Sequence, residues 1–290
     1  MSRFAPSLVR DYYDRHTRAF VGLGEGRQSG AIHRAVWAPG VRTADEAIHY
    51  VDDQIAVAIR TLARAAHHEP PTTIHHPAHV VDLGCGVGAS LIRLAQRFPI
   101  RGTGVTLSPV QAGLAAHRIS AAGLAGRVEC IEADFCGLPP TVEQADAAFA
   151  IESFVHVTDA SRFFEQCRRL IRPGGVLIIC DDFRSARSGG AGDEAIERFC
   201  QGWHVNTLVT PEELRTQAAA AGFEHQTTDD LTPYLRIPRP RDRVIGAFLA
   251  VVERLPFARR RFDDLIGGRA LQTCLKRGWI TYQLAVFRRR

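Results

Sequence analysis

The stretch that decides the fold reads Val80-Val81-Asp82-Leu83-Gly84-Cys85-Gly86-Val87-Gly88. Its apolar beginning predicts a short strand over residues 79–83. Glycines at positions 84 and 86 permit a tight turn and let bare backbone approach a ligand. The helix after the turn begins with unpaired backbone amides, which suit a polar ligand. A loop of this kind indicates a nucleotide-type binding site at the end of the first strand of an α/β domain.

Apolar runs and amphipathic stretches alternate along the chain beyond this loop. Further strands are predicted over residues 102–107, 128–133, 145–151, 175–180, 223–228 and 280–287. Helices are predicted over 91–98, 111–122 and 163–171, with Arg172-Pro173-Gly174-Gly175 ending the last of these, and from Thr210 to Gly222. This alternation predicts an α/β fold with a Rossmann-like, mostly parallel seven-stranded sheet and helices on both faces. An N-terminal helical arm and a C-terminal helical insertion that forms a cap complete the expected architecture.

Four segments divide the chain in this interpretation. They are an N-terminal helical arm or lid over 1–77, the binding core over 78–230, the helical cap insertion over 231–279 and the last core strand over 280–290. In the arm, Thr43 and Glu46 match a capping box, and the apolar residues after them predict one helix to about Ala66. Residues 67–77 hold three prolines and four histidines. We interpret them as a linker, because a Pro-rich backbone holds no fixed ligand geometry.

The composition of the 290 residues is that of a soluble globular protein, with 46% apolar and 23% charged residues. No stretch approaches the roughly 20 apolar residues of a membrane span. No signal peptide is recognised either, which predicts a cytoplasmic protein. Seven cysteines without a CxxC pair predict small buried side chains and no metal site. The net charge is +5, and its late arginine clusters are interpreted as a solvated face. No nucleic-acid partner is predicted, and homo-oligomerisation is left open.

The glycine loop alone also fits a dinucleotide-binding enzyme, through Gly84, Gly86 and Ala89. Two features argue against that class. Asp82 is placed to take a positively charged group, which NAD sites do not require. The position about twenty residues on, where an NAD enzyme carries its ribose acid, reads Thr106-Leu107-Ser108 and has no carboxylate.

Residues 78–185 resemble the class I S-adenosylmethionine-dependent methyltransferases. The segment from Asp82 to Gly88 is similar to the glycine-rich first motif of that family. Asp134 resembles the acid that contacts the adenine amino group, and the segment from Leu170 to Gly175 resembles the turn that precedes a strand. The resemblance implies S-adenosyl-L-methionine as cofactor and S-adenosyl-L-homocysteine as product. The cofactor-binding residues that it implies are Asp82, Gly84, Cys85, Gly86, Thr106, Leu107, Gln111, Ala133, Asp134, Phe135 and Ile151.

The second strand departs from the general pattern of the family, because most members carry an acid for the ribose there. The segment from Gly104 to Gln111 instead resembles the branch that contains prenyl, sterol and tocopherol methyltransferases and cyclopropane fatty-acid synthases. In that branch Thr106, Ser108 and Gln111 would be polar contacts to the cofactor.

The acceptor side is predicted after the fourth strand, in Ile151-Glu152-Ser153-Phe154-Val155-His156. The Asn/Asp-Pro-Pro-Tyr type of motif that N- and DNA-methyltransferases place there is absent. The Glu-Ser pair resembles methyltransferases that act on prenyl double bonds, which makes Glu152 the candidate base. The alternative is a carboxylate that binds the cofactor's amino group or a neighbouring helix end. His156 is either an acceptor-site residue or a structural hydrogen-bonding group. The candidate substrate-binding residues are Tyr12, Tyr13, Phe154, Trp203, His204 and Tyr234.

These observations predict a methyltransferase of secondary metabolism that acts on a small apolar acceptor. The favoured reaction is C-methylation of an isoprenoid double bond, in a prenyl chain or prenyl diphosphate, through a carbocation. The alternative is O-methylation of a phenol or hydroxyl of a natural product, with His156 as the base. A module that senses the cofactor without turnover is disfavoured by the intact glycine loop. Mg²⁺ is expected only if the acceptor is a diphosphate, which the arginines within 236–243 would suit.

Overall fold

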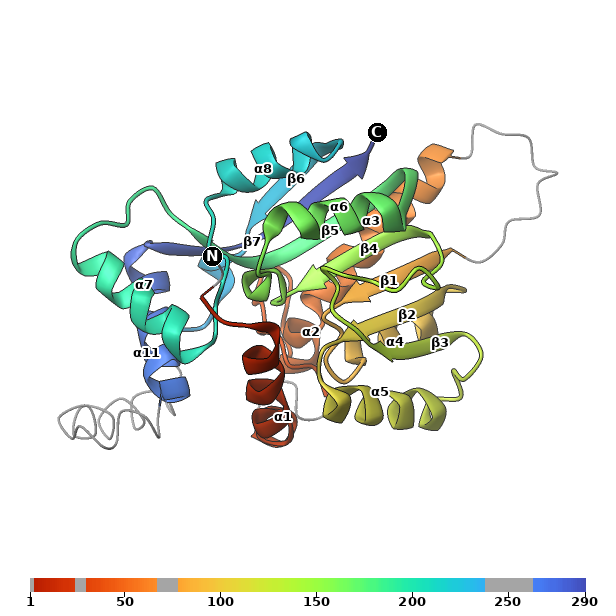
Figure 1. The fold of residues 1–290 in the computed structure, drawn as a ribbon, viewed down its shortest axis with the longest axis horizontal. Coiled ribbons are helices and arrows are strands. Elements are labelled where there is room, and N and C mark those ends of the chain that lie inside the picture. Colours follow the sequence, from red (N-terminus) through yellow and green to blue (C-terminus); the bar gives the residue numbers. More distant parts are fainter. Residues whose placement is uncertain (1–2, 24–29, 67–77, 238–262) are drawn as a thin grey trace.

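A computed structural model describes residues 3–23, 30–66, 78–237 and 263–290 (Figure 1). The predicted linker at 67–77 and the helical pattern around 242–254 lie outside the described residues. The helices are α1 (Pro6–Leu23), α2 (Ala44–Ile48), α3 (Tyr50–Ala66), α4 (Ala89–Arg97), α5 (Pro109–Ala121), α6 (Ala160–Leu170), α7 (Ala191–Gly202), α8 (Pro211–Ala220) and α11 (Asp263–Arg277). The strands are β1 (His79–Leu83), β2 (Arg101–Thr106), β3 (Val128–Glu132), β4 (Ala145–Ile151), β5 (Ile171–Arg184), β6 (Phe223–Asp230) and β7 (Ile280–Arg289). Two short 3₁₀ turns, η1 (Phe154–His156) and η2 (Thr232–Tyr234), follow β4 and β6.

The described strands form one seven-stranded sheet in the order β3-β2-β1-β4-β5-β7-β6. All neighbours pair in parallel except β7, which runs antiparallel between β5 and β6. The direction in which strands are added reverses between β1 and β4, and such a switch point leaves a crevice at the carboxyl ends of the strands. The predicted mostly parallel sheet is confirmed, and the glycine loop after β1 lies at this crevice.

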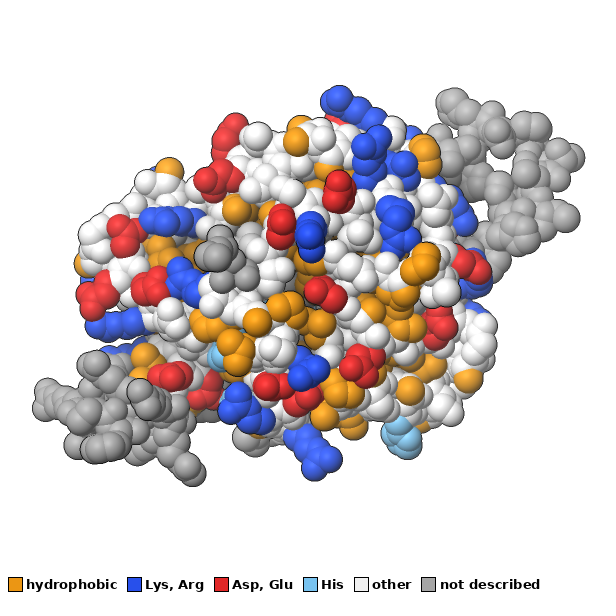
Figure 2. Space-filling view, in the orientation of Figure 1, with side chains coloured by type: hydrophobic (Ala, Val, Ile, Leu, Met, Phe, Trp, Pro, Cys, Tyr) orange, Lys and Arg blue, Asp and Glu red, His pale blue; other side chains and the backbone are white. Residues whose placement is uncertain are grey.

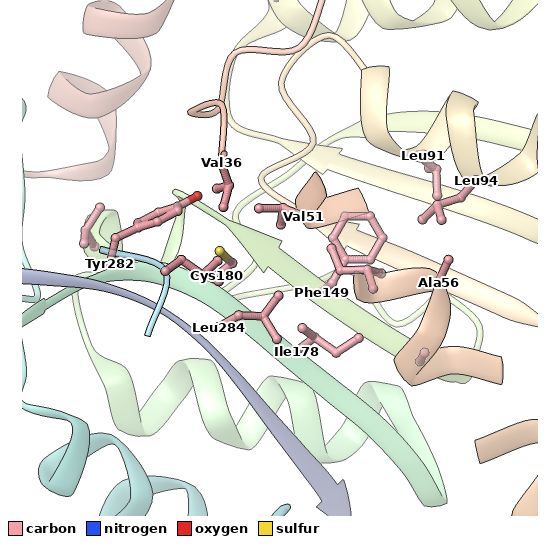
Figure 3. Packing of buried hydrophobic residues seen from close by; sticks show 14 of the residues in the cluster. Val36, Val51, Ala56, Leu91, Leu94, Phe149, Ile178, Cys180, Tyr282 and Leu284 are labelled. Atoms are coloured by element: carbon pink, nitrogen blue, oxygen red, sulfur yellow. The ribbon is translucent and has the colours of Figure 1, made fainter. Parts of the chain in front are cut away.

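Successive residues of each central strand fill apolar layers on opposite faces of the sheet. Ile178 of β5 belongs to the layer that contains Leu91 of α4, and Figure 3 shows these residues together with Phe149 of β4. The next residue, Ile179, belongs to the layer that contains Phe163 of α6. Because helices cover both faces, the strands read as nearly continuous apolar runs in the sequence.

Two local predictions differ from the structure. The helix expected from Thr43 to Ala66 is interrupted at His49, which lies between α2 and α3 with φ −96° and ψ 3°. His49 is buried and its Nδ1 lies 2.9 Å from Asp52 Oδ2, so a polar contact in the core stabilises the interruption. The fifth strand begins at Ile171 rather than at Gly175, and its pairing with β4 shifts register across the Arg-Pro-Gly-Gly segment. The capping boxes at Thr43 and Thr210 are both formed.

Helix α1 stands between α5 and the pair formed by α7 and α11 (Figure 1). Helices α7 and α11 pack closely, since a Cβ atom at Gly267 of α11 would lie 2.9 Å from the Cα atom of Gly202 of α7. The described part of the C-terminal insertion therefore flanks the same region as the N-terminal arm. No helix in the described ranges combines the length and the apolar character that a membrane crossing requires.

Acidic and basic side chains are interspersed over the face drawn in Figure 2, with basic ones gathered near the end that carries the C-terminus. Two arginines at that end have structural partners. Arg288 Nε donates to the carbonyl of Gly174 at 3.3 Å, and Arg289 donates to the carbonyl of Ile171. This part of the late arginine cluster therefore stabilises the irregular segment at the start of β5.

Candidate active site

A cavity opens at the carboxyl ends of the parallel strands, under α1. It is lined on the strand side by the glycine loop, by the residues that follow β2 and β4, and by Asp181 and Asp182 of β5. On the side of the helices it is lined by apolar and aromatic residues, among them Val9, Phe199 and Trp203. The cavity is therefore continuous from the cofactor loop to an apolar compartment.

The structure brings most of the sequence-predicted residues to this cavity. Those that line it are Gly84, Gly86, Thr106, Leu107, Gln111, Asp134, Phe135, Ile151, Glu152, His156, Tyr12, Tyr13 and Trp203. The remaining six, Asp82, Cys85, Ala133, Phe154, His204 and Tyr234, are not among its described lining residues.

For four of the residues that do not line the cavity, the structure shows other surroundings. Phe154 is 1% exposed and packs against Phe163 in the core, because η1 turns its side chain inward. Tyr234 lies in η2, where its carbonyl accepts a hydrogen bond from the Trp37 amide. His204 packs against the ring of Tyr12 in a tilted arrangement, with 4.9 Å between centroids. Asp82 is buried, and burial, together with the charge of Asp52, raises the pKa of its carboxyl well above the ordinary value.

The polar residues at the end of β2 and directly after it form hydrogen bonds with one another and with α1. Thr106 Oγ1 donates to Gln111 Oε1 at 2.7 Å, and Gln111 Nε2 donates to Thr17 Oγ1 at 3.1 Å. Ser108 caps α5 and its hydroxyl also donates to Asp14. The sequence predicts only cofactor contacts for this group, whereas in the structure it also docks the N-terminal helix.

His156 is held in one tautomer. Its Nδ1 lies 3.1 Å from the carbonyl oxygen of His204, which can only accept, so Nδ1 carries the proton. Nε2 is then the acceptor for the Tyr13 hydroxyl, 2.6 Å away. Burial lowers the pKa of His156 to about 4. The ring is therefore neutral at physiological pH, with its lone pair on the cavity side.

Glu152 is fixed from two directions directly after β4. Its Oε1 accepts hydrogen bonds from the Arg34 amide at 2.8 Å and from the Tyr282 hydroxyl at 2.9 Å. Figure 3 shows Tyr282 reaching from β7 toward the chain at Val36. Glu152 also has a positive φ of 50°, which is uncommon for a residue with a side chain. Such a backbone conformation persists when its surroundings determine it, and here these contacts direct the carboxylate to the cavity wall.

Four titratable residues of the cavity, namely His33, Arg34, Asp181 and Asp182, were missed in the prediction from the sequence. Arg34 forms a bidentate pair with Asp182, with both nitrogen–oxygen distances at 2.7 Å. Asp181 accepts a hydrogen bond from the Val155 amide at 3.1 Å and so supports the turn that carries His156. Burial alone would lower the pKa of His33, but its contact with Asp52 and the charge of Glu152 raise that pKa to about 9. Nε2 of His33 lies 3.7 Å from Asp52 Oδ1.

The cavity fits the cofactor that the sequence implies. The loop is held in place because the amides of Gly84 and Cys85 both donate to the Val105 carbonyl at 2.9 Å. Gly86 leaves the backbone bare at the cavity, while Phe135 and Ile151 offer apolar surface for a ring. Carboxylates, which attract a sulfonium or an amino group, stand on the wall at Asp134 and Glu152.

Comparison with known proteins agrees with this reading of the cavity. A family profile described as a methyltransferase domain matches residues 80–175. The O-methyltransferase rstn1 of Aspergillus nomiae is 28% identical over 74% of this chain and 88% of its own length. The 27-O-demethylrifamycin SV methyltransferase of Amycolatopsis mediterranei is 27% identical over 81% of this chain and 80% of its own length. A geranyl diphosphate methyltransferase solved with GPP and sinefungin shares the fold, with a TM-score of 0.71 at 20% identity over 98% of this chain and 99% of that one.

The fold, the glycine loop and these relatives define the class of the protein. The chain is an S-adenosylmethionine-dependent methyltransferase with a methyltransferase domain over residues 80–175, and the resemblance to the class I enzymes that was found in the sequence is confirmed. Its cofactor is S-adenosyl-L-methionine. The proteins named above are described as methyltransferases of different kinds, so their names alone do not identify the atom that this chain methylates.

Proposed function

We propose that the enzyme O-methylates a hydroxyl group, phenolic or alcoholic, of an apolar natural product, with His156 as the general base. The observation that carries this proposal is the geometry of His156. The imidazole is neutral, its Nδ1 proton is bound to a carbonyl, and its Nε2 faces a hydroxyl. A ring in this arrangement can accept a proton from an oxygen. In the sequence analysis this reaction was the alternative, and the geometry gives it precedence over C-methylation.

The cofactor, when bound, supplies an electrophilic methyl group on a sulfonium. The protein then has to place the acceptor oxygen in line with that group and take up the proton of its hydroxyl. An acceptor that hydrogen-bonds to the Tyr13 oxygen can pass its proton through Tyr13 to His156, and one that displaces Tyr13 gives it directly. Both routes end with the proton on Nε2, where the charge of Glu152 favours the protonated ring.

The charges of the cavity support a neutral acceptor. Among its described lining residues the cations are Arg34, paired with Asp182, and His33, next to Asp52. The positive charges of these described residues are therefore already paired with carboxylates. A diphosphate would lie next to those carboxylates without an unpaired cation among these residues to bind it, which is unfavourable. Apolar side chains such as Val9 and Phe199 favour a hydrophobic skeleton instead.

The experiment that tests this proposal uses methyl-labelled S-adenosylmethionine and two acceptor panels. One panel holds phenols and hydroxylated polyketides, and the other holds prenyl diphosphates and prenylated arenes. We expect label on oxygen in products from the first panel, identified by mass spectrometry and by the chemical shift of an O-methyl group. Label on carbon in a product from the second panel would overturn the proposal.

The second candidate is C-methylation of an isoprenoid double bond, as the sequence analysis favoured. The specific observation in its support is Glu152, which lines the same cavity as the cofactor loop and the aromatic residues. Methyl attack on an alkene carbon leaves a carbocation, and a fixed carboxylate can stabilise this cation and then accept its proton.

Glu152→Gln distinguishes the two candidates. The amide keeps an oxygen that can accept from Arg34 and Tyr282, but it loses the charge and the basicity. For hydroxyl methylation we expect single-turnover rates within roughly tenfold of the unmodified enzyme, below the 10²-fold scale of a lost general base. For alkene methylation the loss should reach that scale. Glu165→Gln on the exposed side of α6 is the control and should behave as the unmodified enzyme.

A further inference from the structure

A chain of hydrogen bonds runs from the cofactor side of the cavity to His156, and it passes through α1. It begins at β2, where Thr106 donates to Gln111 at 2.7 Å, and continues from Gln111 to the Thr17 hydroxyl at 3.1 Å. Thr17 in turn donates to the backbone carbonyl of Tyr13 at 2.6 Å, and the Tyr13 hydroxyl donates to His156 at 2.6 Å. The two ends of the chain therefore meet on one turn of α1.

Thr17 connects the two halves of this chain of hydrogen bonds. It is 0% exposed and its hydroxyl has both of its roles filled, as acceptor from Gln111 and as donor to Tyr13. A threonine on a helix often bonds to the carbonyl four residues before it, but such a bond needs no partner from another element. The additional contact with Gln111 ties α1 to α5 at the level of Tyr13.

We propose that Thr17 is a positioning residue that couples occupation of the cofactor site to the placement of Tyr13 against His156. This inference rests on the proposed role of His156 as the base. Gln111 and Thr106 line the cavity, so a bound cofactor acts on the same side chains that hold Thr17. A coupling of this kind is reciprocal. If a bound cofactor favours the docked position of α1 by a certain factor, docking of α1 strengthens cofactor binding by the same factor.

The surroundings of His156 make this coupling measurable without any acceptor. The titratable groups that face the Tyr13–His156 pair are Tyr12 on α1, Glu152 after β4, Asp181 on β5 and His204 after α7. Burial dominates the low pKa of His156, and α1 supplies part of that burial through Tyr13. Loosening α1 therefore admits water to the ring and raises the pKa of His156 toward its ordinary value.

The test is Thr17→Val, which keeps the shape of the side chain and removes the hydroxyl. We expect faster amide hydrogen exchange along α1 and an upward shift of the His156 titration followed by NMR. Affinity for S-adenosylhomocysteine, measured by calorimetry, should fall by roughly two- to tenfold, the scale of one neutral hydrogen bond. In the unmodified chain, S-adenosylhomocysteine should slow exchange along α1, a result that needs no variant.

Two variants provide the comparison. Thr61→Val on α3 removes the same kind of bond, from Thr61 to the Val57 carbonyl at 2.9 Å, at an exposed position that does not line the cavity, and should change none of the readouts. Thr17→Ser retains the hydroxyl and should restore all of them. The proposal is wrong if Thr17→Val matches Thr61→Val, if Thr17→Ser fails to restore the readouts, or if S-adenosylhomocysteine leaves exchange along α1 unchanged. Because no methyl transfer is measured, failure of hydroxyl methylation would be seen separately, in the acceptor panels.

Discussion

Replacing His156 by alanine is expected to lower the rate of methyl transfer to a hydroxyl acceptor by roughly 10²–10⁴, the contribution of a positioned general base. The variant has no base to accept the proton of the acceptor hydroxyl, because the Tyr13 hydroxyl loses the Nε2 atom to which it donates. Cofactor affinity should fall by no more than roughly tenfold, through the loss of the one hydrogen bond between His156 and Tyr13 of α1. Single-turnover rates with labelled cofactor and calorimetric titration with S-adenosylhomocysteine measure the two quantities independently.

The pH dependence of the unmodified enzyme provides a second measurement of the same group. A base acts in its unprotonated form, and burial holds the pKa of His156 at about 4. The acid limb of kcat/KM should therefore fall only as the pH approaches that value, and not near the ordinary histidine value of about 6.5. Exposed His117 on α5 is the matched control, and its replacement by alanine should leave both rate and profile unchanged. Full activity of His156→Ala together with an inactive Glu152→Gln enzyme would establish the alkene reaction instead.

Much of the fold could be predicted from the sequence because buried parallel strands leave a direct signal. The apolar runs around Val80, Phe149 and Ile178 mark strands that helices cover on both faces, and all of them are found in the sheet. The break in the helix at His49 has no such signal. The break depends on the contact between His49 and Asp52 inside the folded core. The apolar periodicity of the sequence continues across His49 without interruption, so it cannot reveal the break.

The candidate site was predictable where its residues follow a strand and only partly predictable where they come from the arm, from which Tyr12 and Tyr13 were predicted but Arg34 was not. Glu152 and His156 were found because they come directly after an apolar strand. The same reasoning would have found Asp181 and Asp182, which follow the apolar run of β5. Arg34 has no local signal, since its partner Asp182 lies 148 residues away in the sequence.

The polar residues after β2 show a second limit of sequence reasoning. Their types and spacing indicate a cofactor contact, and Thr106 and Gln111 do line the cavity. Their hydrogen bonds to each other and to Thr17 depend on where α1 docks. A helix nearly a hundred residues earlier in the chain cannot be placed against them by a motif.

Gly86→Val should lower affinity for S-adenosylhomocysteine by roughly 10²-fold or more, the scale of overpacking a well-fitted site. Gly86 has a φ of 53° and lines the cavity, and a Cβ atom there would meet only Ile32 Cδ1, at 3.3 Å. A branched side chain therefore adds backbone strain and fills space that the bare loop leaves to the cofactor. Calorimetric titration measures the affinity, and thermal unfolding measures the strain.

Gly123→Val separates these two effects. Gly123 has a similar φ of 68°, but a Cβ atom there meets nothing within 4 Å, and the residue does not line the cavity. Both variants should lose stability to a similar extent, because both place a β-branched residue in the left-handed region. Only Gly86→Val should lose cofactor affinity, since only its side chain stands where the cofactor lies. Equal affinities in the two variants would mean that the cofactor does not approach the backbone at Gly86.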